Sequence, residues 1–176
     1  MNQIDLKKII RNVPDFPKKG IVFRDITPLI GNKEAFRYVT DKLAERYKDR
    51  GIDYVVSVES RGFIFGAALS YVIGAGLVPV RKKGKLPHKT HRVTYDLEYG
   101  TDTLEIHQDA VGQGKKVLIL DDLLATGGTT CATIELIEKL GGEIVEAAFI
   151  VELEFLKGRE KIKDIPIFSL VKYEEE

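Results

Sequence analysis

Short apolar runs alternate along the chain with segments whose apolar residues recur at helical spacing. One such helical stripe consists of Phe36, Val39, Leu43 and Tyr47. Strands are predicted at 52–59, 76–82, 115–122 and 143–153, and helices at 62–74 and from about Gly127 onward. Strands that alternate with helices are typical of a parallel sheet covered by helices. The pattern therefore predicts an α/β fold with a mostly parallel central sheet flanked by helices.

Two segments depart from this rhythm. Residues 93–107 alternate with a period of two around Gly100, which predicts an antiparallel β-hairpin, a flap inserted after a basic loop. The prolines and glycine of residues 13–29 predict an extended, turn-rich lid. Because no repeat or linker divides the sequence, we expect one domain over 1–176. It would have a hood at about 1–32 and a core at about 33–176, with a flexible basic loop and hairpin at 82–107.

The composition narrows the class of protein. The chain has 176 residues, a formal net charge of zero and 44% hydrophobic residues, enough for a real core. The charge balance gives no case for nucleic-acid binding, and no apolar run reaches the length of a membrane span. Cys131 is the single cysteine, and the first ten residues lack the apolar core of a signal peptide. We therefore expect a cytoplasmic protein that binds neither nucleic acid nor membrane.

Two adjacent carboxylates, Asp121 and Asp122, end an apolar strand, and a glycine-rich turn at 125–130 follows them. Ligands of open parallel sheets bind beyond the carboxyl ends of the strands, and N–H groups of a turn at a helix start can surround an anion. The carboxylates would repel a nucleoside triphosphate, and no GxxxxGKS/T segment compensates. A sugar monophosphate fits better. Its hydroxyls can donate to the aspartates, whose charge would stabilise a cation at the anomeric carbon.

Residues 117–130 resemble the phosphoribosyl pyrophosphate (PRPP) motif of the type I phosphoribosyltransferases. This resemblance implies that Asp121 and Asp122 take part in catalysis and that the turn binds the 5′-phosphate of PRPP. The residues implied for that phosphate are Ala125, Thr126, Gly127, Gly128 and Thr129. Taken without the resemblance, the paired acids could be a polar strand end and the turn a plain helix start.

The pyrophosphate of such a donor needs a second anion site, and two stretches offer cations. Residues 59–63 follow a strand and open a helix, and residues 81–92 form a dense basic loop. Taken alone, Arg61 could be a structural ion pair and the loop a solvated surface. The resemblance implies a pyrophosphate site, shared in part across a dimer interface, and a cis peptide bond in the first stretch. The implied residues are Glu59, Ser60, Arg61, Arg81, Lys82 and Lys85.

The lid offers a place for a base. Val22, Phe23 and Arg24 could present backbone polar groups beside an aromatic face, which suits a planar purine, although Phe23 alone could be a core residue. The segment resembles the adenine-binding segment of the adenine phosphoribosyltransferases. That resemblance implies adenine contacts from these three residues and from Leu153, which lies in a further matching segment at 151–161.

The flap supplies a candidate for proton transfer. Its residues 95–100 resemble the family's flap, which implies that Glu98 lies over the reaction centre beside Tyr99. A carboxylate there could accept or relay the proton that adenine loses as it attacks. Taken alone, Glu98 could be an exposed hairpin acid.

The resemblance covers nearly the whole chain in family order and implies one reaction. This is the Mg²⁺-dependent transfer of ribose 5-phosphate from PRPP to adenine, which gives AMP and pyrophosphate in purine salvage. We expect Mg²⁺ to arrive with the substrate, bound by its oxygens and by water, because no compact carboxylate and histidine cage appears in the sequence. A homodimer is implied as well. The alternatives are a regulatory protein that senses PRPP, an ATPase, and a transferase for another purine.

Overall fold

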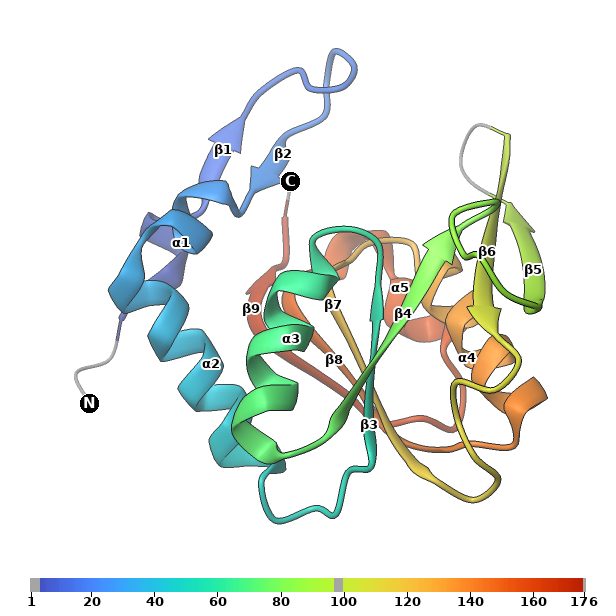
Figure 1. The fold of residues 1–176 in the computed structure, drawn as a ribbon. Helices are drawn as coiled ribbons and strands as arrows, with labels where there is room; N and C mark the ends of the chain where they lie inside the picture. Colours follow the sequence, from blue (N-terminus) through green and yellow to red (C-terminus); the bar gives the residue numbers. More distant parts are fainter. Residues whose placement is uncertain (1–3, 97–99, 176) are drawn as a thin grey trace.

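The computed structural model describes residues 4–96 and 100–175, arranged as Figure 1 shows. The elements in chain order are η1 (Leu6–Lys8), β1 (Arg11–Val13), β2 (Phe23–Asp25), α1 (Thr27–Gly31), α2 (Lys33–Tyr47), β3 (Tyr54–Val58), α3 (Gly62–Ile73), β4 (Gly76–Lys82), β5 (Thr90–Asp96), β6 (Thr101–His107), β7 (Lys116–Leu124), α4 (Gly128–Leu140), β8 (Glu143–Leu153), η2 (Glu154–Leu156), α5 (Gly158–Lys161) and β9 (Ile167–Tyr173). None of the helices within the described ranges is long and apolar enough to cross a membrane.

A seven-stranded sheet forms the centre of the fold, with the strand order β5-β6-β4-β3-β7-β8-β9. The strands from β4 to β9 in this order run parallel, whereas β6 pairs antiparallel with both β4 and β5. The predicted α/β class and the predicted hairpin are therefore confirmed. The lid is more regular than the sequence predicts, because β1 and β2 pair as a small antiparallel sheet.

Both faces of the sheet are covered, which explains why its central strands read as continuous apolar runs. Successive side chains of β7 point to opposite faces. Leu118 packs in the cluster that contains Leu43 of α2 and Phe65 of α3, whereas Ile119 packs in the cluster that contains Leu136 of α4. Figure 1 shows α2 and α3 on one side of the sheet and α4 on the other. The sheet thus forms a rigid support for the loops at its ends.

The parallel strands bring their carboxyl ends to one edge of the sheet. From the neighbouring strands β3 and β7, the chain proceeds to β4 on one side and to β8 on the other. The loops after β3 and β7 therefore diverge and leave a crevice between them, the usual place for a ligand in such sheets. Figure 1 shows the β1–β2 and β5–β6 hairpins both projecting beyond this edge.

Candidate active site

A cavity of about 330 Å³ lies in this crevice. Its lining includes residues from the predicted catalytic, phosphate and pyrophosphate groups, together with residues of the flap hairpin. The lining residues are Val58, Glu59, Ser60, Arg61, Lys82, Tyr95, Asp102, Leu104, Asp121, Asp122, Leu123, Ala125 and Thr129. A smaller adjoining cavity of about 80 Å³ is formed by the glycine-rich turn and also contacts Asp121. Residues distant in sequence thus meet around these two cavities, in the crevice where the loops after β3 and β7 diverge.

The two aspartates of β7 are buried at the base of the cavity, although both are acidic. The backbone N–H of Asp122 donates to Asp121 Oδ1 over 2.8 Å, and Arg61 Nε donates to Asp122 Oδ2 over 2.5 Å. Burial, and then the neighbouring charge of Asp122, raise the pKa of Asp121 well above its usual range. The pair therefore combines an ion-paired carboxylate, Asp122, with one whose charge is costly because it is buried beside another carboxylate, Asp121.

The turn at 125–130, which is predicted to bind the 5′-phosphate and is here called the phosphate turn, lies at the start of α4. The first N–H groups of a helix lack helical partners. Gly127 precedes the helix with a left-handed backbone, φ +82°, which favours glycine. A second glycine, Gly158 at the start of α5, presses on this turn. A Cβ atom placed on Gly158 would lie 2.1 Å from the carbonyl oxygen of Ala125. The turn is therefore shaped by direct backbone contact with the segment that follows β8.

That segment is held by a buried carboxylate. Glu152, 2% exposed, accepts from Arg159 Nε at 2.9 Å and Nη2 at 2.7 Å, and from Ser169 Oγ at 2.6 Å. Arg159 Nη1 also donates to the carbonyl oxygen of Ile167. The α5 segment is thus tied to β8 and β9, so Gly158 cannot easily move away from the turn.

Glu59 holds the side chains of two predicted pyrophosphate cations, Lys85 and Arg81. Its carboxylate accepts from Lys85 Nζ at 2.6 Å, from Arg81 Nε at 3.2 Å and from the backbone N–H of Lys82 at 3.2 Å. Burial opposes ionisation of Glu59, but the hydrogen bonds from Lys85, Arg81 and Lys82 prevail and lower its pKa to about 2. The peptide bond between Glu59 and Ser60 is cis, as the resemblance implies.

A different carboxylate pairs with the side chain of Lys82. Its Nζ lies 3.0 Å from Asp102 Oδ2 on β6. Arg61 pairs with Asp122 in the same way. All four predicted cations therefore cluster near the cavity, and each already has a carboxylate partner.

The hood presents one aromatic residue toward the site. The Phe23 ring centroid lies 5.8 Å from the guanidinium carbon of Arg61. Val22 directly precedes β2, whereas the side chain of Arg24 points to the other face of the hairpin and packs on Tyr173. Leu153 ends β8 and packs against the core cluster on the α2 side. A role of Arg24 in base recognition would therefore come from its backbone.

Comparisons with known proteins agree with this geometry. The family described as phosphoribosyl transferase domain matches residues 29–174. The adenine phosphoribosyltransferase of Chloroflexus aurantiacus is 57% identical over 98% of this chain and 100% of its own length. The crystal structure of adenine phosphoribosyltransferase from Thermoanaerobacter pseudethanolicus has a TM-score of 0.93 and 52% identity, covering 96% of this chain and 98% of that one. The chain belongs to the adenine phosphoribosyltransferase family.

A related structure carries ligands of the expected kinds. The adenine phosphoribosyltransferase of Saccharomyces cerevisiae, complexed with adenine and an imino-altritol bisphosphate, is 44% identical with a TM-score of 0.89 and covers 94% of this chain and 96% of that one. The sequence-based assignment to this family is therefore confirmed.

Two polar residues of the cavity lining, Tyr95 and Asp102, are absent from the site residues predicted from the sequence. They are register partners in the β5–β6 hairpin, so they lie on the same face. Thr129 Oγ1 donates to the hydroxyl of Tyr95 over 3.2 Å, which connects the flap to the phosphate turn. The period-two alternation of the hairpin was the available signal, because it sorts residues by face once the turn is fixed. The predicted flap residues Glu98 and Tyr99 lie outside the described residues.

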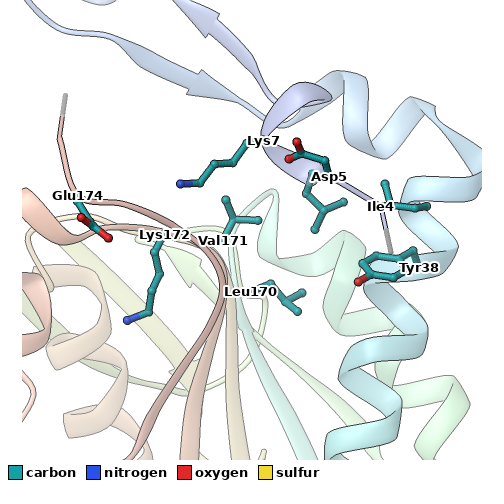
Figure 2. A pocket seen from close by; sticks show the side chains of 9 residues that line it. Ile4, Asp5, Lys7, Tyr38, Leu170, Val171, Lys172 and Glu174 are labelled. Atoms are coloured by element: carbon teal, nitrogen blue, oxygen red, sulfur yellow. The ribbon is translucent and has the colours of Figure 1, made fainter. Parts of the chain in front are cut away.

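A separate cavity of about 610 Å³ lies between η1 and the end of β9, as Figure 2 shows. Its lining includes Lys7, Tyr38, Leu170 and Lys172, and none of the predicted site residues. It has no glycine-rich turn and no paired carboxylates at a strand end. The crevice between β3 and β7 is therefore the candidate active site.

Proposed function

We propose that this chain transfers ribose 5-phosphate from PRPP to adenine, forming AMP and pyrophosphate in purine salvage, with Mg²⁺. One observation carries the proposal. The two buried aspartates of β7, a glycine-rich turn at a helix start and a cluster of cations lie around two adjoining cavities at the carboxyl ends of β3 and β7. A donor with a phosphate at one end and a pyrophosphate at the other needs these three features together.

The donor would lie along the cavity from the turn to the basic segment. The backbone N–H groups of residues 125–129 bind its 5′-phosphate, helped by the hydroxyl groups of Thr126 and Thr129. Asp121 and Asp122 accept hydrogen bonds from the ribose hydroxyls and stabilise the cation that develops at the anomeric carbon. The raised pKa of Asp121 favours this role, because a cationic centre restores the stability of its ionised form.

The pyrophosphate would replace carboxylates as the partner of the cations. Arg61, Arg81, Lys82 and Lys85, with the backbone of Ser60, are the groups that bind it. Glu59 contributes by holding Arg81 and Lys85 in place until the donor arrives. Each cation is thus positioned before binding, which reduces the entropy lost on binding.

Adenine would bind between the hood and the end of the donor cavity. Phe23 stacks on the base, the backbone groups of Val22 and Arg24 read its edge, and Leu153 contributes an apolar contact. Glu98 takes or relays the proton that adenine loses, with Tyr99 beside it on the flap.

Mg²⁺ fits the donor set without a dedicated protein cage. Among the described residues, no group of three or more His, Cys, Asp or Glu side chains could hold a metal ion. Asp121 and Asp122 are hard oxygen donors that can hold a hydrated Mg²⁺ through its water shell, with the remaining ligands from the substrate. When bound, the metal neutralises charge on the pyrophosphate leaving group.

A homodimer is proposed from the outer side of α3. In the described chain, this helix and the start of β4 carry exposed large apolar residues, Ile64, Tyr71, Val72 and Leu77, and Tyr71 is 90% exposed. Apolar side chains gathered in this way typically mark a protein interface. Sedimentation of the parent and of Tyr71→Asp should give a dimer and a shift toward monomer. The lone Cys131 supports a cytoplasmic location.

The function is tested by base specificity. The protein is incubated with PRPP, Mg²⁺ and one of adenine, hypoxanthine, guanine or xanthine, and nucleotide and pyrophosphate are measured. We expect AMP from adenine and much slower reaction with the other bases, and loss of activity in the double variant Asp121→Asn/Asp122→Asn. PRPP binding without nucleotide formation would instead indicate a sensor, and preference for another base would identify a different transferase.

A further inference from the structure

Arg24 of β2 is a buried cation that has no carboxylate partner among the described residues. Its residue is only 7% exposed, and no acidic group of the described chain forms an ion pair with it. Nη1 donates to Asn12 Oδ1 over 2.6 Å, on the neighbouring strand β1, whereas Nε is buried and has no hydrogen-bond partner among the described atoms. Such burial is costly unless another interaction stabilises the charge.

The stabilising partner is an aromatic ring at the other end of the chain. The guanidinium carbon of Arg24 lies 4.2 Å from the ring centroid of Tyr173, the last residue of β9, and Lys7 Nζ of η1 lies 5.1 Å from the same centroid. Figure 2 shows Lys7 reaching from η1 toward the end of β9. The hydroxyl of Tyr173 is buried and makes no hydrogen bond to the described atoms. The ring, rather than the hydroxyl, therefore makes the contact.

The opposite face of the same hairpin is the one that faces the active site. Phe23 alternates with Arg24 along β2 and pairs in register with Val13 of β1. Val13, Phe16, Phe23 and Asp25 line a cavity of about 240 Å³, and the Phe23 ring lies 5.8 Å from Arg61. Since β1 and β2 have three residues each, the hairpin has little core of its own to fix its height over the site.

We propose that Tyr173 is a positioning residue for adenine, because its ring holds Arg24 and thereby sets the place of Phe23 and the adjacent backbone over the site. This inference rests on the proposed function. It links the end of the C-terminal strand to base binding. The cations and aspartates of the PRPP site lie in β4, in β7 and in the loops after β3 and β4, and the ion pairs that hold them do not include Tyr173.

The test compares Tyr173→Leu with Tyr173→Phe in steady-state assays of the full chain. Leucine removes the ring, whereas phenylalanine keeps it and removes only the hydroxyl, which makes no hydrogen bond to the described part of the chain. We expect Tyr173→Leu to raise the KM for adenine by about two- to thirty-fold, the range for loss of one cation–π contact, with little change in the KM for PRPP. Tyr173→Phe should stay within about two-fold of the parent in both, since no hydrogen bond is lost.

A second variant covers the case in which Tyr173→Leu does not fold. Arg24→Met keeps the backbone groups of β2 and removes the cation, so it should raise the KM for adenine in the same way, and the double variant should be no worse than the more affected single variant. Equal increases in both KM values, an unchanged KM for adenine, or additive losses would overturn the inference.

Hydrogen exchange separates this inference from the function itself. Amides of β1 and β2 should exchange faster in Tyr173→Leu than in the parent, while those of β7 and β8 stay protected. This readout needs no substrate. A parent protein that is inactive toward adenine would refute the proposed function. Unchanged hydrogen exchange of the β1 and β2 amides in Tyr173→Leu would refute the positioning role of Tyr173.

Discussion

The contact between Gly158 and the phosphate turn leads to a specific expectation for Gly158→Ala. The added Cβ would lie 2.1 Å from the carbonyl oxygen of Ala125 and 2.9 Å from the backbone nitrogen of Gly127. Cβ atoms essentially never lie closer than 3.0 Å to such groups, so the two backbones must separate by about 0.9 Å. Neither contact can be relieved by rotating a side chain.

The strain should fall on the turn rather than on α5. Arg159, next to Gly158, is held by both oxygens of Glu152 and by the carbonyl oxygen of Ile167. The turn, by contrast, contains the left-handed Gly127, and the hydrogen bond from Thr129 Oγ1 to the Tyr95 hydroxyl, at 3.2 Å, is longer than those that hold Arg159. A displacement of about 1 Å in groups that position a substrate can lower activity by about 10²-fold. We therefore expect the affinity for PRPP to fall by about ten- to a hundred-fold, because the phosphate N–H groups move out of place.

Calorimetric titration with PRPP, alongside steady-state kinetics and thermal unfolding, tests this expectation. The matched control is Gly31→Ala, because a Cβ at Gly31 meets no atom within 4 Å and its backbone is not left-handed. The control should bind PRPP like the parent. Parent-like PRPP affinity in a folded Gly158→Ala protein would show that the turn does not bind the phosphate, or that the α5 segment yields instead.

Other substitutions test the remaining parts of the site. Asp121→Asn and Asp122→Asn should each lower turnover with little loss of folding. Asp121→Asn should not lower the melting temperature at neutral pH, because burial already raises the pKa of Asp121 and makes its ionised form costly. Turnover equal to that of the parent in the double variant would contradict the assignment. Gly128→Val should abolish PRPP binding in calorimetry, since even a Cβ there would lie 3.3 Å from the Tyr95 ring and a branched side chain is larger; retained affinity would place the phosphate elsewhere. Glu98→Gln should keep PRPP binding but lose about 10²–10⁴-fold in turnover, with a larger loss for Glu98→Leu, and parent-like rates in both would leave Glu98 without a role in proton transfer.

The central elements could be predicted because their environment leaves a clear pattern in the sequence. The runs at 76–82 and 143–153 match the bounds of β4 and β8. The helix predicted from about Gly127 begins at Gly128, where the glycines interrupt the apolar periodicity. Strands that are covered on both faces have continuous apolar sequences, and the helices that cover them have apolar residues at helical spacing. Both patterns differ clearly from the polar sequences of the loops.

The edge strand β9 and the short strands β1 and β2 have no comparable hydrophobic pattern in the sequence. Strand β9 pairs only with β8 at the edge of the sheet, and most of its residues are half-buried. Strands β1 and β2 have three residues each, too few for a periodicity to emerge. Their order depends on contacts between the two ends of the chain, such as Arg24 on Tyr173, and no local pattern reports such a contact.

The charges of the site follow the same logic. From the sequence, the basic loop is expected to offer unpaired cations to an anion. In the structure, Lys85 pairs with Glu59, which lies 26 residues earlier in the chain, and Lys82 pairs with Asp102. These pairs form because strand ends meet in space. If pyrophosphate binds as proposed, it displaces these carboxylates. The free energy of binding is then the difference between two ion pairings and is smaller than the number of cations suggests. On the proposed site, the same exchange would favour release of the product, because the carboxylates would pair with their cations again as pyrophosphate leaves.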